Sequence, residues 1–139
     1  MRAPRHARRR AVRATYILPQ AETSAGWARY LTTAFLTHGC GEKVSGEQVE
    51  DATLIVSELV ANATRHGHSG CRLRLHVDPG QVTVEVEDAS PVPPTMCTPD
   101  PLEESGRGIA MVRQLSQEFC VLGGPGGGKT VQAVLAATC

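Results

Sequence analysis

The sequence predicts an α+β fold, a two-layer α/β sandwich in which a mixed, mostly antiparallel sheet is covered by helices on one face. Two observations predict this fold. Apolar and polar residues alternate in two hairpin-like regions, at 73–86 and 118–136. Apolar residues recur at helical spacing in three other segments. Strands that follow one another through tight turns pair antiparallel. The length of 139 residues suits one domain.

The N-terminal region is expected to contain a tail, a strand and a helix. Residues 1–13 have no apolar period and are expected to form a basic, disordered tail, which leaves 14–139 as the folded domain. Residues 15–18 are typical of a short strand, closed by Pro19. Residues 21–38 are expected to form a helix. Its apolar residues at helical spacing are Trp27, Leu31, Ala34 and Phe35.

A second helix is expected from Ser45 to about Gly67. Ser45 and Gln48 form a capping-box pattern, and acidic residues such as Glu47 lie near the positive end of the helix dipole. Its apolar stripe comprises Val49, Ala52, Val56, Leu59, Val60 and Ala63.

The two hairpins follow from the alternation. Strands at 73–77 and 82–86 are joined by the turn Asp78-Pro79-Gly80. Strands at 118–122 and 130–136 are joined by a glycine-rich turn.

Between the hairpins, residues 89–105 contain five prolines and are expected to form a long loop, which in so small a domain is usually functional. A short helix is expected to start at Gly106–Ile109 and to follow Gly108.

The formal net charge of zero hides an uneven distribution. Residues 1–13 hold six arginines and no acid, which leaves 8 basic and 14 acidic residues in the remainder, a net charge of −6. Arginines without interleaved aromatic residues would make only salt-sensitive contacts with nucleic acid. We therefore expect a solvated tail and no nucleic-acid partner, with nucleic-acid binding as the competing interpretation.

Membrane and secreted classes are not expected. The apolar runs are only a few residues long, and the arginine-rich start is not followed by an apolar leader segment. The cysteine number is odd and no CxxC pair occurs; the five are Cys40, Cys71, Cys97, Cys120 and Cys139. We expect free thiols in a reducing cytoplasm.

Residues 123–130, Gly-Gly-Pro-Gly-Gly-Gly-Lys-Thr, match the Walker A expression. A P-loop needs a following helix, and only nine residues follow Thr130. The segment is therefore interpreted as a hairpin turn, whose amides and Lys129 could still approach a phosphate.

Four polar residues lie along one side of the second predicted helix: Glu58, Asn62, Arg65 and His66. Glu58 and Asn62 are flanked by apolar residues and should sit at the rim of the core. A carboxylate and an amide oxygen one turn apart can share Mg²⁺, or the carboxylate can act as a general base. A solvated polar face explains the same spacing.

Two further signals flank the proline-rich loop. Asp88 ends a strand and could accept a hydrogen bond from a ligand amine, although aspartate is also a common turn former. The two glycines in Gly106-Arg107-Gly108 allow close approach to a phosphate at a helix start. Together these pieces describe one nucleotide pocket.

The segment Glu58-Leu-Val-Ala-Asn62-Ala-Thr-Arg-His66-Gly67 resembles the N-box of the GHKL ATPases, the superfamily of gyrase, heat-shock chaperone, histidine kinase and mismatch-repair ATP-binding domains. The close match to E-L-V-x-N-A-x-x-H-G, the small size and the Gly-Arg-Gly-Ile turn resemble its anti-sigma-factor serine/threonine kinase branch. The resemblance covers about residues 14–136 and implies the GHKL (Bergerat) ATP-binding fold.

The resemblance implies a role for each matching residue. Glu58 would be the general base, Asn62 the Mg²⁺ ligand, and Asp88 the acceptor for the adenine amino group. Thr130 would support adenine binding beside Asp88. The remaining ATP contacts would be Arg65, His66, Ser90, Pro91, Gly106, Arg107, Gly108 and Ile109.

The first glycine box departs from the family pattern, because Asp88-Ala89-Ser90-Pro91-Val92 stands where the family has D-x-G-x-G. The stiffer backbone predicts weaker ATP binding. The implied function is an ATP- and Mg²⁺-dependent serine/threonine kinase that phosphorylates an anti-anti-sigma partner and binds a sigma factor, as a homodimer. The alternative is a regulatory module that binds partners without phosphorylating them.

Overall fold

The computed structural model describes residues 12–40, 44–66, 69–89, 104–123 and 128–136. Their five strands form one sheet in the order β1-β2-β3-β5-β4. The strands are β1 (Val12–Leu18), β2 (Cys71–Asp78), β3 (Gln81–Asp88), β4 (Glu118–Gly123) and β5 (Lys129–Ala136). Every described pairing is antiparallel, so the sheet is not mixed in these segments.

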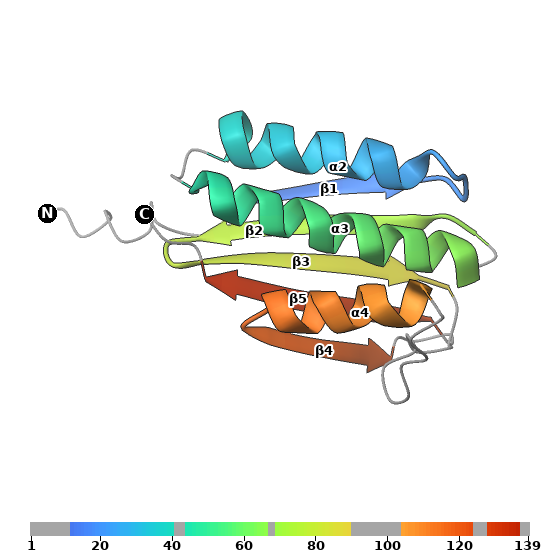
Figure 1. Ribbon diagram of the computed structural model, residues 1–139. Coiled ribbons are helices and arrows are strands. Elements are labelled where there is room, and N and C mark those ends of the chain that lie inside the picture. The colour runs from blue at the N-terminus through green and yellow to red at the C-terminus, as the bar shows by residue number, and fades with distance from the viewer. Residues whose placement is uncertain (1–11, 41–43, 67–68, 90–103, 124–127, 137–139) are drawn as a thin grey trace, which may run out of the picture.

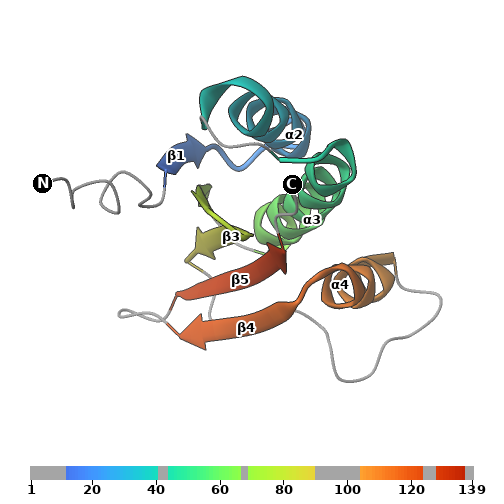
Figure 2. The ribbon, with the colours of Figure 1, turned by 90° about the vertical axis from the view of Figure 1, so that its left-hand side faces the viewer.

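Three helices lie on one face of this sheet, as Figures 1 and 2 show. They are α2 (Ser24–Ala34), α3 (Gly46–His66) and α4 (Glu104–Leu115), and the π-helical turn η1 (Phe35–Gly39) continues α2. The predicted α+β sandwich is confirmed. Within the described segments no helix is long and apolar enough to cross a membrane.

The core lies between α3 and the central hairpin. Three apolar pairs face each other across β2 and β3, namely Leu73–Val86, Leu75–Val84 and Val77–Val82. Helix α3 covers them with Ala52, Ile55, Val56, Leu59, Val60 and Ala63, all of which are buried. The β2–β3 turn contains Gly80 with a φ of 100°, a conformation that glycine adopts without steric cost.

Helix α3 begins as its sequence predicts. The Gln48 amide donates a hydrogen bond to Ser45 Oγ over 3.1 Å, and the Val49 amide donates to the Ser45 carbonyl over 2.9 Å. One of the unpaired donors at the helix start is thereby satisfied by the cap residue.

The predicted apolar stripe of the first helix is only partly buried: Phe35 is buried and Leu31 packs against the core, but Trp27 does not. Trp27 is 59% exposed, whereas Ser24, Ala28 and Thr32 are buried. Small side chains allow α2 to lie close to α3, where Arg29 donates a hydrogen bond to Ser57 Oγ over 2.9 Å. Close packing of the two helices therefore decides the buried face, and the large apolar residue points outward.

Two predicted boundaries were wrong. Strand β1 already includes Val12 and Arg13, which pair with Val77 and His76, so the edge strand extends into the predicted tail. Helix α4 begins at Glu104, before the Gly106–Ile109 segment that was expected to start it. Residues 1–11 and most of the predicted loop, 90–103, lie outside the described residues.

Candidate functional site

Four elements meet at one end of the sandwich. Strand β3 ends where β5 begins, and the end of α3 and the start of α4 lie at the same end of the sheet (Figure 1). Because β5 is the neighbour of β3 in the sheet, residues 41 positions apart come into contact there. The predicted residues at 58–66, 88 and 106–109 are thus carried by elements that converge.

Glu58 and Asn62 lie one turn apart in the second half of α3. Asn62 is only 7% exposed, and Glu58 is half-buried. A solvated polar face therefore does not describe Asn62. A buried amide and a carboxylate along one side of a helix form a pair of oxygen donors at the edge of the core.

The Glu58 side chain lies directly against the backbone of α4. A Cβ added at Gly108 would collide with the Glu58 carboxylate and would lie 2.6 Å from its Cδ. A side chain at position 108 would therefore require the end of the Glu58 side chain to move. The buried side chains of Ile109 and Val112 hold the same helix on the core.

The early start of α4 changes the role of its glycines. Gly106 falls in the first turn, where amides lack partners within the helix, but Gly108 and Ile109 lie in the second turn. The prediction that Gly108 sits at a helix start was therefore wrong. Gly108 instead gives α4 its close contact with Glu58.

Asp88 forms a buried ion pair that the sequence did not suggest. The Lys129 Nζ donates to Asp88 Oδ2 over 2.9 Å and to Oδ1 over 3.1 Å. The two side chains are 2% exposed for Asp88 and 4% for Lys129. The two residues are direct partners in the β3–β5 register, so both side chains lie on the same face of the sheet.

Thr130 is not beside Asp88, contrary to expectation. It pairs with Glu87 and is only partly buried, since successive side chains in a strand point to opposite faces. Lys129 takes the place that was expected for Thr130. The pattern that could have shown this is the apolar alternation Val131, Ala133 and Leu135, which places residue 129 on the helix-covered face.

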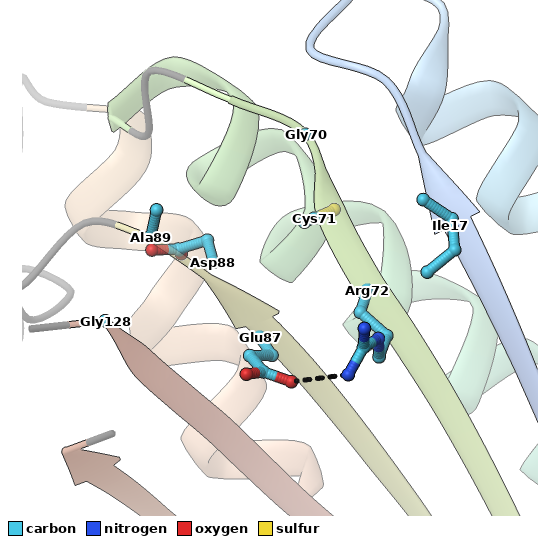
Figure 3. A pocket seen from close by; sticks show the side chains of 8 residues that line it. All are labelled: Ile17, Gly70, Cys71, Arg72, Glu87, Asp88, Ala89 and Gly128. Atoms are coloured by element: carbon cyan, nitrogen blue, oxygen red, sulfur yellow. Dashed lines mark hydrogen bonds and ion pairs between the residues drawn. The ribbon is translucent and has the colours of Figure 1, made fainter. Parts of the chain in front are cut away.

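A cavity of about 410 Å³ opens next to Asp88, between the ends of β2, β3 and β5 (Figure 3). Its lining includes Cys71, Asp88, Ala89 and Gly128. The backbone is tightly packed here, because a Cβ at Gly128 would lie 2.6 Å from the Asp88 carbonyl oxygen. A cavity of this size lies within the ~300–1,000 Å³ range of small-molecule sites.

The Cys71 thiol beside this cavity stays neutral. Burial, and then the nearby Asp88 charge, raise its pKa to about 11. The described cysteines Cys40, Cys71 and Cys120 are free thiols, as predicted. Cys97 and Cys139 lie outside the described residues.

The other predicted residues are only partly placed. Arg65 is exposed and lines a second cavity, of about 510 Å³, with Gln20 and Thr64 between the start of α2 and the end of α3. The structure therefore places Arg65 on the α2 side of α3, whereas Glu58 faces α4. Ser90 and Pro91 lie outside the described residues, as do the side chains of His66 and Arg107.

The oxygen atoms of Glu58 and Asn62 suit a magnesium ion whose other ligands are phosphate and water oxygens. In the described part of the chain, no three residues among His, Cys, Asp and Glu gather as a metal site. Asn62 and Glu58 offer hard oxygen atoms, and Mg²⁺ typically binds one or two protein groups together with phosphate and water oxygens. These two residues fit such an ion.

The fold and the site define a small ATPase-like domain, and the comparisons with known proteins agree. The family described as histidine kinase-like ATPase domain matches residues 18–135. The chain belongs to this family, which confirms the resemblance found in the sequence.

A solved structure shows the same fold. It contains the RsbU and RsbW domains of Rv1364c from Mycobacterium tuberculosis, with 19% sequence identity and a TM-score of 0.69. The match covers 92% of the present chain and 33% of that chain, so the present chain spans about a third of its length. No curated protein matches the chain.

Proposed function

We propose that the protein is an ATP-dependent serine/threonine kinase of the anti-sigma-factor type. The observation that carries this proposal is the contact between Glu58 and Gly108, which sets a carboxylate next to the buried Asn62 and against α4. The histidine kinase-like ATPase family supports ATP as the substrate. The fold shared with a chain that contains an RsbW domain supports the anti-sigma assignment.

Glu58 acts as the general base in this proposal. It accepts the proton of a serine or threonine hydroxyl while that oxygen attacks the γ-phosphorus of ATP, and ADP leaves with the electrons of the broken P–O bond. Asn62 holds Mg²⁺, which offsets phosphate charge when it is bound. Much of the rate in phosphoryl transfer comes from the positioning of the reacting groups.

The nucleotide contacts are proposed from the same resemblance. Asp88 accepts a hydrogen bond from the adenine amino group. The remaining ATP contacts are His66, Ser90, Pro91, Gly106 and Arg107. Arg65 lies on the α2 side of α3, Gly108 packs against Glu58 and Ile109 is buried in the core, so these three residues are not proposed to contact ATP. The partners are an anti-anti-sigma protein, which is phosphorylated, and a sigma factor, which is held by a homodimer in the cytoplasm.

A second function is favoured by one observation. Asp88 is covered by Lys129, which leaves little of its carboxylate surface for a base. A domain of this kind could regulate its partner by binding alone. Phosphate transfer separates the two functions, because a binding module does not move phosphate to its partner.

The test uses Mg-ATP labelled at the γ-phosphate and a small candidate partner protein. We expect transfer by the wild type and a loss of at least ~100-fold in Glu58→Gln, with ATP binding retained. Glu50→Gln is the matched control, because Glu50 is an exposed glutamate on the same helix. Equal transfer by Glu58→Gln and the wild type would overturn the role of Glu58, and ATP binding without transfer to any partner would favour the binding module.

A further inference from the structure

The Asp88–Lys129 pair occupies the position that the proposed function assigns to base recognition. Both carboxylate oxygens accept hydrogen bonds from one ammonium group, over 3.1 and 2.9 Å. The Asp88 side chain is 2% exposed. In this arrangement almost no carboxylate surface remains for the amino group of a nucleobase.

The charges of Asp88 and Lys129 also depend on one another. A buried carboxylate and a buried ammonium compensate one another, and removal of one partner leaves an uncompensated charge. Lys129 therefore stabilises the nucleotide-free protein at the site where the base must bind. A ligand that binds to the Asp88 carboxylate has to displace the Lys129 ammonium group. The free energy that this displacement costs weakens the binding of the ligand.

We propose that Lys129 is an internal competitor of the nucleobase and thereby determines the nucleotide affinity of this protein. The inference rests on the proposed function, because the role of Asp88 in base recognition comes from it. It goes further because it assigns a role to Lys129, a residue of β5. Lys129 occupies the Asp88 carboxylate until a nucleotide binds.

The proposal predicts two effects of opposite sign for Lys129→Met. The free protein becomes less stable, because buried Asp88 loses its countercharge. Nucleotide binds more tightly, because the ligand now supplies the missing donor and meets no competitor. The expected gain is at least tenfold in Kd, since a hydrogen bond to a charged group exceeds the ~1.4 kcal/mol that corresponds to tenfold.

The matched control is Arg72→Met. Arg72 lines the same cavity as Asp88 but lies on the outer face of the sheet, where its Nη1 is 3.5 Å from Glu87 Oε1 and makes no contact with Asp88 that would compete with a base (Figure 3). Both substitutions remove one positive charge. A general attraction between protein and triphosphate predicts weaker ATP binding in both variants, whereas competition predicts tighter binding in Lys129→Met alone.

The experiment measures binding by calorimetry for the wild type, Lys129→Met and Arg72→Met, with three probes: Mg-ATP, adenosine and inorganic tripolyphosphate. Thermal unfolding of each ligand-free protein is recorded alongside. We expect Lys129→Met to lower the Tm and to bind ATP and adenosine more tightly, with no gain for tripolyphosphate. Lys129→Gln, which keeps a donor without the charge, replaces Lys129→Met if the latter does not fold.

The failures of the two proposals look different. If the wild type binds ATP and neither Lys129 variant binds it more tightly, the competitor role is overturned and the proposed function stands. A gain that tripolyphosphate shares also overturns the role, because the effect then lies at the phosphates. If the folded wild type and the Lys129 variants all fail to bind ATP and adenosine, the proposed function falls, and the inference falls with it.

Discussion

The Glu58 carboxylate lies where a side chain at Gly108 would have to be, so helices α3 and α4 meet through a carboxylate and a bare stretch of backbone. This contact fixes the position of the proposed base relative to the helix that follows the loop. It also explains a glycine inside a helix, where glycine otherwise costs about 1 kcal/mol relative to alanine.

Gly108→Ala is expected to stabilise the protein by less than the roughly 1 kcal/mol that the better helix propensity of alanine would give. The added methyl group displaces the Glu58 carboxylate, which is the end of a flexible, half-buried side chain, so the loss of its contact with α4 offsets part of the gain. Urea unfolding measures the change. Gly46→Ala is the control, because a Cβ at this exposed position in the first turn of α3 meets no atom of the described segments within 4 Å.

The same contact predicts a non-additive pair. In a Glu58→Ala background the obstacle is absent, so Gly108→Ala should stabilise the protein by the full ~1 kcal/mol. Equal effects of Gly108→Ala in the wild-type and Glu58→Ala backgrounds would show that the two residues are not in contact.

Thr32→Val is expected to stabilise the protein by about 1 kcal/mol. Thr32 is fully buried in α2, and its Oγ1 has no hydrogen-bond partner among the residues that the structure describes. Valine has nearly the same shape and removes the cost of a buried, unsatisfied hydroxyl. Thr33→Val, at an exposed neighbour, should change the free energy of unfolding much less, and equal effects of the two substitutions would contradict the burial argument.

The Cys71 thiol should make stability depend on alkaline pH. Its pKa rises from 9.0 to about 11 in the folded protein, so the folded state holds the proton more strongly than the unfolded state. The resulting stabilisation is fully present below pH 9 and is lost as the pH rises to about 11. The difference in unfolding free energy between the wild type and Cys71→Ser should fall over this interval.

Burial also raises the pKa of Tyr16. Both proteins contain Tyr16, so its effect cancels in the difference, which then reports on Cys71 alone. A difference that stays constant from pH 8 to about 11 would refute the shift.

Much of the fold could be predicted because its signals are local. The alternation in β2 and β3, the stripe of α3 and the hydrogen bond from Gln48 to Ser45 each follow from a few neighbouring residues. The N-box-like segment likewise predicted the pair Glu58 and Asn62, which the structure brings to the side of α4 and the rim of the core.

The wrong predictions concern positions where contacts between segments far apart in the sequence determine the structure. Trp27 is apolar, yet the close approach of α2 to α3 favours the small Ala28 on the buried face. The apolar alternation of β5 places residue 129 on the helix-covered face, but the pairing of Lys129 with Asp88, where Thr130 was expected, depends on the register between β3 and β5. Neither contact is visible without the position of a second element.

The most direct test of the central claim is calorimetric titration with ATP, with and without Mg²⁺, of the wild type and Asn62→Ala. Each titration is repeated with Lys129→Met present in both proteins, so that weak binding caused by Lys129 is not mistaken for no binding. The account predicts Mg²⁺-dependent ATP binding that Asn62→Ala loses in both backgrounds. No binding at millimolar ATP in either background, in protein shown to be folded, would contradict it.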